Sequence, residues 1–141
     1  MTEEAFNPTP DEIASACQTT LPELALKGIA LFNDRRFFEA HEELELAWRA
    51  EPGVVRELYR GILQVAVAYY HITRGNYRGA EKMFTRAARW LAPFPGACCG
   101  LDLDGFRCDY RQVEEALRRL GPRGIGDIDR GLFKPLRFLD N

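Results

Sequence analysis

The chain has 141 residues, of which 46% are hydrophobic and 28% are charged, and its formal net charge is −2. This length and composition predict one soluble globular domain, and the slightly acidic balance argues against nucleic acid as a partner, because nucleic-acid-binding domains carry a clear basic excess. No apolar run reaches the roughly 20 residues that a membrane span needs, since the longest stretch, residues 61–72, contains Gln64 and His71.

The N-terminal residues and the cysteines both predict a cytoplasmic protein. The N-terminal residues are acidic and polar and lack the basic and apolar regions of a secretory signal, and those before about residue 10 are expected to be mobile. Four cysteines are too sparse for a disulfide framework, so reduced thiols are expected. A metal cluster of Cys98, Cys99 and Cys108 lacks paired CxxC spacing and a nearby histidine. The sequence leaves open the role of these cysteines and whether the chain forms a homo-oligomer.

Apolar residues at helical spacing predict about five helices along the chain. The first covers residues 21–33 and opens on a capping-box pattern formed by Thr20 and Glu23. The second begins at Phe37 and ends before Pro52, where the chain has a helix-breaking Pro-Gly pair.

A third helix is predicted over residues 54–74. Its middle is apolar on nearly every face, which is typical of a helix with neighbours on several sides, so we expect it at the centre of the molecule. Gly75 ends this helix, and Asn76 is the predicted N-cap of a fourth helix that ends before Pro93.

Residues 93–105 contain two prolines and three glycines and are predicted to form a loop. A fifth helix is predicted over residues 109–120. The tail from Gly121 is rich in glycine, but its apolar residues predict that it packs on the other helices. The predicted fold is therefore an all-α, single-domain helical bundle over residues 1–141, with two helical hairpins and an irregular C-terminal tail.

A weak internal similarity relates residues 28–52 to residues 75–87, about 40 positions later, at spacings that resemble those of a tetratricopeptide repeat. The period is longer than the 34 residues of that repeat, and a solenoid normally needs three or more copies to bury its faces. A tetratricopeptide-like protein-interaction module is therefore one alternative.

The second and third predicted helices hold both histidines of the chain. At 100° per residue, His41 points to the core side of its helix, with Glu45 one turn beyond it. Gln64 and His71 lie two turns apart on one face of the next helix. A hairpin of these helices predicts a polar site, and its candidate residues are Glu39, His41, Glu42, Glu45, Gln64 and His71.

Three roles suit such a cluster. His41, Glu45 and His71 are ligand types for a divalent metal such as zinc, iron or manganese. A carboxylate beside a histidine also makes an acid/base pair for an enzyme that acts on a small molecule. The third role is a buried hydrogen-bonded network that fixes the helices in register. The function predicted is a soluble helical protein whose polar cluster is structural or binds a metal, with the enzyme and the interaction module as alternatives.

Two stretches of this chain carry a recognisable pattern, FFEAHEELELAWR and RGILQVAVAYYHITRGNYRGA. They resemble the small helical prokaryotic proteins grouped as domain of unknown function 309. The resemblance implies an all-helical bundle and no particular activity. The positions that match the family pattern in the first stretch are Glu39, His41, Glu42, Glu45, Trp48 and Arg49. Those in the second stretch are Gly61, Gln64, His71, Gly75, Asn76, Gly79 and Ala80.

Overall fold

The computed structural model describes residues 6–139. Residues 1–5, which belong to the segment that is predicted to be mobile, lie outside the described range. The first helix, α1 (Pro10–Cys17), lies in a region where no helix was predicted. It opens on a capping box, in which Thr9 Oγ1 accepts a hydrogen bond from the Glu12 backbone N–H (3.1 Å) and Glu12 Oε1 accepts one from the Thr9 N–H (2.9 Å). The two reciprocal bonds satisfy donors that a helix start otherwise leaves unpaired.

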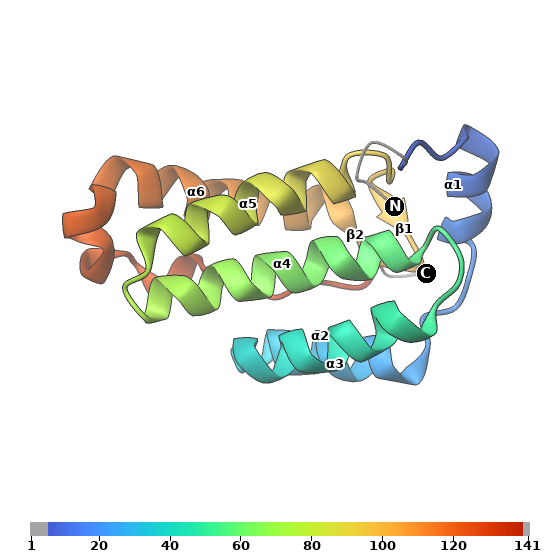
Figure 1. Ribbon diagram of the computed structural model, residues 1–141, viewed down its shortest axis with the longest axis horizontal. Coiled ribbons are helices and arrows are strands. Elements are labelled where there is room, and N and C mark those ends of the chain that lie inside the picture. The colour runs from blue at the N-terminus through green and yellow to red at the C-terminus, as the bar shows by residue number, and fades with distance from the viewer. Residues whose placement is uncertain (1–5, 140–141) are drawn as a thin grey trace.

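Four central helices follow one another as antiparallel neighbours, and the third of them lies between the second on one side and the fourth on the other (Figure 1). Buried leucine, isoleucine, alanine and aromatic side chains from all four join one hydrophobic core. Burial of this apolar surface is the main stabilising term of the fold. The helices are α2 (Glu23–Asn33), α3 (Phe37–Ala50), α4 (Arg56–Thr73) and α5 (Tyr77–Leu91).

Two glycines allow neighbouring helices to approach closely. A Cβ atom at Gly28 of α2 would lie 2.6 Å from Leu44 Cγ of α3, and one at Gly61 of α4 would lie 2.5 Å from Leu91 Cγ of α5. Real carbon atoms do not approach to such distances, because van der Waals contact between carbons lies near 3.5–4.0 Å. Each of the two hairpin contacts therefore requires a residue without a side chain.

The predicted loop over residues 93–105 contains a two-stranded antiparallel sheet, β1 (Ala97–Cys98) and β2 (Leu101–Asp102), and the start of the next helix. That helix, α6 (Leu103–Gly124), begins six residues before the predicted one, and its N-cap is Asp102, whose side chain accepts from the Gly105 N–H. At Gly121 the backbone leaves helical geometry (φ 72°), so the regular part of α6 ends where the sequence indicated.

The C-terminal tail carries two short 3₁₀ turns, at residues 125–127 and 130–132, and then extends back along the molecule. The side chain of Asn33 holds it by two bonds, donating to Leu136 O (3.0 Å) and accepting from the Leu136 N–H (2.8 Å). Farther on, Leu139 N donates to Gly100 O at 2.8 Å. The last described residues of the tail therefore lie beside the small sheet.

The all-α class is confirmed, with six α-helices among residues 6–139 instead of about five. None of the helices in that range has the length and apolar character to cross a membrane. The expectation of reduced thiols is wrong for two of the four cysteines, because Cys17 at the end of α1 and Cys98 in β1 form a disulfide. The sequence pattern gave no sign of this bond, since the two residues meet only through the tertiary fold.

Candidate functional site

The hairpin of α3 and α4 brings two of the predicted site residues face to face. Trp48 Nε1 of α3 donates to Glu57 Oε1 of α4 at 2.9 Å, so these two positions lie opposite each other. Seven residues before Trp48 is His41, and seven residues after Glu57 is Gln64. Seven residues make about two helical turns, so the same antiparallel register places His41 opposite Gln64.

The pair has an unusual property in the folded chain. His41 Nδ1 and Gln64 Oε1 are both buried, and neither has a hydrogen-bond partner within the described residues. Both residues as a whole are only partly buried. Most buried polar atoms in proteins are paired, and one without a partner costs roughly 1–3 kcal/mol. Both atoms therefore have hydrogen-bonding capacity that no group in the described part of the chain satisfies.

Aromatic side chains border the pair. The ring of Phe38 lies 5.7 Å from the His41 ring and 5.2 Å from the Tyr70 ring, measured between centroids. Phe38 is 49% exposed, which is high for a phenylalanine. The surface beside the polar pair is therefore apolar and open to solvent.

The structure places His71 in a different environment, at the turn between α4 and α5. Asn76 Oδ1 accepts from the Gly79 N–H (2.9 Å), which orients the Asn76 amide so that its Nδ2 faces His71 Nδ1 at 3.3 Å. Because that amide nitrogen only donates, His71 accepts at Nδ1 and carries its proton on Nε2. Burial lowers the pKa of His71, which favours this neutral form. His71 thus stabilises a turn.

The three predicted carboxylates pair with arginines of their own helix turn or face solvent. Glu39 forms an ion pair with Arg36, and Glu45 Oε1 lies 3.3 Å from Arg49 Nη2, in each case with a residue three or four positions away. Glu42 is exposed to solvent. Among residues 6–139, no group of three or more His, Cys, Asp or Glu side chains is arranged to hold a metal ion. The predicted ligand set of His41, Glu45 and His71 stays a prediction that this geometry does not favour.

A second polar cluster joins α3, α4 and α5, and it includes a residue that the sequence did not single out. Glu57 is only 7% exposed, and its Oε1 accepts from Trp48 Nε1 and pairs with Arg60 Nε at 3.2 Å. The Arg60 guanidinium lies over two indole rings, 4.6 Å from that of Trp48 and 4.0 Å from that of Trp90. An acid three residues before an arginine in a helix predicts such a pair, but not its burial between two tryptophans.

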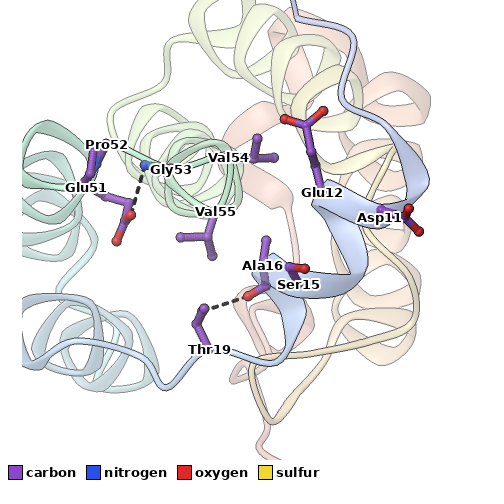
Figure 2. A pocket seen from close by; sticks show the side chains of 10 residues that line it. All are labelled: Asp11, Glu12, Ser15, Ala16, Thr19, Glu51, Pro52, Gly53, Val54 and Val55. Atoms are coloured by element: carbon purple, nitrogen blue, oxygen red, sulfur yellow. Dashed lines mark hydrogen bonds between the residues drawn. The ribbon is translucent and has the colours of Figure 1, made fainter.

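An open pocket of about 570 Å³ lies between α1 and the α3–α4 connection (Figure 2). Three of its lining residues are acids, Asp11, Glu12 and Glu51. Two of these acids already accept backbone hydrogen bonds, Glu12 from Thr9 and Glu51 from Gly53 (3.0 Å). None of the six predicted site residues lines this pocket, so it is separate from the His41–Gln64 pair.

Comparison with known proteins agrees with the motif. A family model described as "Domain of unknown function (DUF309)" matches residues 25–83, which include α3, α4 and the turn after α4. The chain is 39% identical over 87 residues to the "Uncharacterized protein YpuF" of Bacillus subtilis (strain 168), an alignment that covers 57% of this chain and 50% of that protein. Residues 25–83 of this chain are thus similar to the DUF309 family.

A second relative is more distant. An "Uncharacterized protein" of Aquifex aeolicus (strain VF5) is 26% identical over 106 residues, which cover 74% of this chain and 30% of that protein. The chain therefore spans half the length, or less, of these two relatives. The matched family region contains His41, Gln64 and His71, so the candidate site lies within what the family shares with this chain.

Proposed function

We propose that this protein is a binding module that recognises a small polar ligand at the His41–Gln64 pair of the α3–α4 hairpin. The observation that carries the proposal is that His41 Nδ1 and Gln64 Oε1 are both buried without a partner in the described part of the chain, on positions that the helix register places opposite each other. A ligand that bonds to both atoms would recover the free energy that their burial costs.

The atoms define the chemistry of the ligand. Gln64 Oε1 only accepts, so the ligand has to offer a hydroxyl or an amide N–H, while His41 Nδ1 donates or accepts according to its tautomer. The adjoining rings of Phe38 and Tyr70 suit an apolar or aromatic portion of the same molecule. Because both polar atoms are covered, entry requires a side chain to move, and the half-exposed Phe38 is the one that lies against His41.

The test uses the complete chain purified without an affinity tag. Native mass spectrometry, followed by denaturation and analysis of the released small molecules, is expected to find a bound organic species. That species should be absent from Gln64→Leu and retained by Gln112→Leu, a matched change at an exposed glutamine of α6. Elemental analysis of the same samples covers zinc, iron and manganese. Stoichiometric metal that disappears in His41→Ala would contradict the organic ligand and assign the pair to a metal.

Unfolding measurements separate ligand binding from a purely structural role. In the ligand-free protein, we expect the double variant His41→Leu, Gln64→Leu to be at least as stable as the parent, because two unpaired polar atoms are removed together. A structural network would differ in the single variants, because His41→Leu or Gln64→Leu alone would then leave a partner unpaired at a cost of about 1–3 kcal/mol. A loss of that size in each single variant, with no bound species in the parent, would refute the proposal.

A further inference from the structure

Three cysteine sulfur atoms lie together at the end of the molecule where α1 meets the small sheet. The disulfide joins Cys17 to Cys98, and Cys99 Sγ is 4.0 Å from Cys98 Sγ. The backbone holds the group in place, because Cys99 N donates to Cys17 O at 2.7 Å. The fourth cysteine, Cys108, is an exposed free thiol on α6 and is a natural control for this group.

A pocket of about 350 Å³ opens onto this cluster. Both Cys17 and Cys99 line it, whereas Cys98 does not line it and is only 2% exposed. Its rim includes Leu26 and Phe138, which are 43% and 49% exposed. A volume of this size is at the lower end of the range for small-molecule sites, so a small reactant can reach the bond from the Cys17 side.

The neighbouring thiol is poorly suited to attack the disulfide itself. Burial raises the pKa of Cys99, although a hydrogen bond with Thr19 acts in the other direction. Cys99 Sγ also donates to Ala16 O at 3.3 Å, which occupies its proton. Because the thiolate is the nucleophile in exchange reactions, the attacking sulfur has to come from outside the chain.

We propose that the Cys17–Cys98 disulfide is a thiol-exchange site for low-molecular-weight thiols, with Cys17 as the residue that is modified. The thiolate of the small molecule attacks Cys17 Sγ, the bond between Cys17 and Cys98 breaks, and a mixed disulfide forms on Cys17. Cys98 leaves as a thiolate and takes up the proton that the small thiol lost. The reverse attack by Cys98 restores the original bond and releases the small thiol.

The exchange has a consequence for the fold. The disulfide is the covalent link between α1 and β1, and α1 otherwise buries only Ile13 and Ala16. Modification of Cys17 therefore leaves an eight-residue helix that is held by few apolar contacts. The predicted cytoplasmic location would expose the site to such thiols. This inference does not depend on the His41–Gln64 proposal.

The test incubates the oxidised, full-length protein with reduced glutathione in the absence of oxygen, stops the reaction with acid and alkylates the free thiols before peptide mapping. We expect a glutathione adduct on the peptide that contains Cys17, with about tenfold less on Cys98, because a thiolate attacks the more accessible sulfur. Alkylated Cys98 should appear in proportion to the adduct. Proteolysis within α1 should rise over the same time course.

Two conservative variants keep the assignment open to refutation. Cys99→Ser retains a hydrogen-bonding group beside Ala16 and should keep the Cys17 adduct, as should Cys108→Ser. Loss of the adduct in Cys99→Ser, or an adduct mainly on Cys98, would overturn the proposal. So would a folded protein that forms no adduct while the same protein in urea forms it readily.

Discussion

Glu57 shows how a single buried charge is satisfied between helices. One of its carboxylate oxygens interacts with both Trp48 Nε1 and Arg60 Nε, and the residue is buried. The Arg60 guanidinium in turn lies between two indole rings, where cation–π attraction adds to the ion pair. Because hydrogen bonds to a charged group are stronger than neutral ones, each member of this cluster contributes to the contact between α3 and α4.

Replacing Trp48 with phenylalanine tests that cluster. The change keeps an aromatic ring under Arg60 but removes the N–H that donates to Glu57. We expect the free energy of unfolding in urea to fall by about 1.5–3 kcal/mol, the usual contribution of a hydrogen bond to a charged group. The neighbouring change Arg49→Ala removes only an exposed ion pair with Glu45 and should cost less than about 1 kcal/mol. Equal losses in the two variants would contradict the assigned role of Glu57.

At the scale of elements, the two helical hairpins use the same turn 40 residues apart. Arg35 and Gly75 both have a positive φ, of 62° and 73°. In the first turn the N–H of Arg36 donates to Leu31 O at 2.9 Å, and in the second the N–H of Asn76 donates to His71 O at 2.9 Å. This equivalence explains the weak internal similarity of the sequence, because each turn is followed by a helix with apolar residues at matching positions.

The residue that adopts the left-handed conformation is an arginine in the first turn and a glycine in the second. Exchanging glycine for a side chain, or the reverse, should therefore change stability in opposite directions in the two turns. A side chain at positive φ costs about 1–2 kcal/mol, whereas glycine adopts it freely. Gly75→Ala should therefore destabilise the protein by about 1 kcal/mol even though nothing lies within 4 Å of the added carbon. Arg35→Gly should stabilise the protein by about 0.5 kcal/mol, because the relief of backbone strain exceeds the cost of the greater entropy that glycine gives the unfolded chain. Thermal unfolding would measure both, and shifts of the same sign would refute the argument.

The second turn also predicts a pH dependence through His71. In the folded protein its pKa is lowered by burial, while in the unfolded chain it returns to about 6.5. Above pH 6.5 both states are neutral there, so the turn keeps its full stability. As the pH falls below about 6.5, the unfolded state takes up a proton before the folded state does, and stability is lost until the folded pKa is passed.

The measurement is urea unfolding between pH 7.5 and pH 5, values chosen about one unit or more either side of the ordinary histidine pKa. The difference between the parent and His71→Gln should shrink as the pH decreases, because glutamine does not titrate. A difference that stays constant with pH would show that the pKa of His71 is the same in the folded and unfolded states.

The central helices were predictable because each is long and strongly periodic. The sequence does not predict α1, because Thr9 and Glu12, which cap it, have the same spacing as Thr20 and Glu23. An eight-residue helix is shorter than the window in which periodicity can be judged. At the observed start of α2 the N-cap is Pro22, and no side chain caps the helix. A capping pattern alone does not say which of two similar sites is used.

The candidate site was predictable only in part, for a related reason. Helical phase predicts that His41 and Gln64 lie on facing sides of one hairpin. It did not show that Glu45 pairs with Arg49, because an ion pair one turn away competes with any contact across the hairpin. The partner of His71 lies beyond the end of its own helix, at Asn76, where helical phase does not apply.

At the scale of the whole molecule, the disulfide closes a long section of chain. Cys17 and Cys98 are 81 residues apart in sequence, and α2 to α5 all lie between them. By the chain-entropy model, a loop of this length lowers the entropy of the unfolded state enough to stabilise the fold by about 4 kcal/mol. We expect reduction of the bond to lower the free energy of unfolding by about 2–4 kcal/mol, measured in urea with and without dithiothreitol. A Cys17→Ser, Cys98→Ser variant that equals the oxidised parent would contradict this.

The tail runs back along the bundle, and a side chain at the end of α2 is one of the groups that hold it. Asn33, at the end of α2, makes two hydrogen bonds to the backbone of Leu136, a residue that is fully buried. Arg137 adds an ion pair to Asp109 of α6, with Nη1 and Oδ2 3.2 Å apart. The tail is thus attached to both α2 and α6.

Asn33→Ala should weaken the attachment of the tail to α2 more than a substitution at a neighbouring residue would. The change leaves both backbone groups of Leu136 without their partner, and two lost hydrogen bonds at a partly buried site predict a cost of about 1–3 kcal/mol. Because the tail also covers core residues, amide exchange should speed up at residues 133–139 before it changes in α4, whose amides depend on global unfolding. The matched change Asp34→Ala alters an exposed residue next to it and should leave exchange in the tail unchanged. Uniform faster exchange across α4 and the tail in Asn33→Ala would show that the tail is not a separate unit but unfolds together with the central helices.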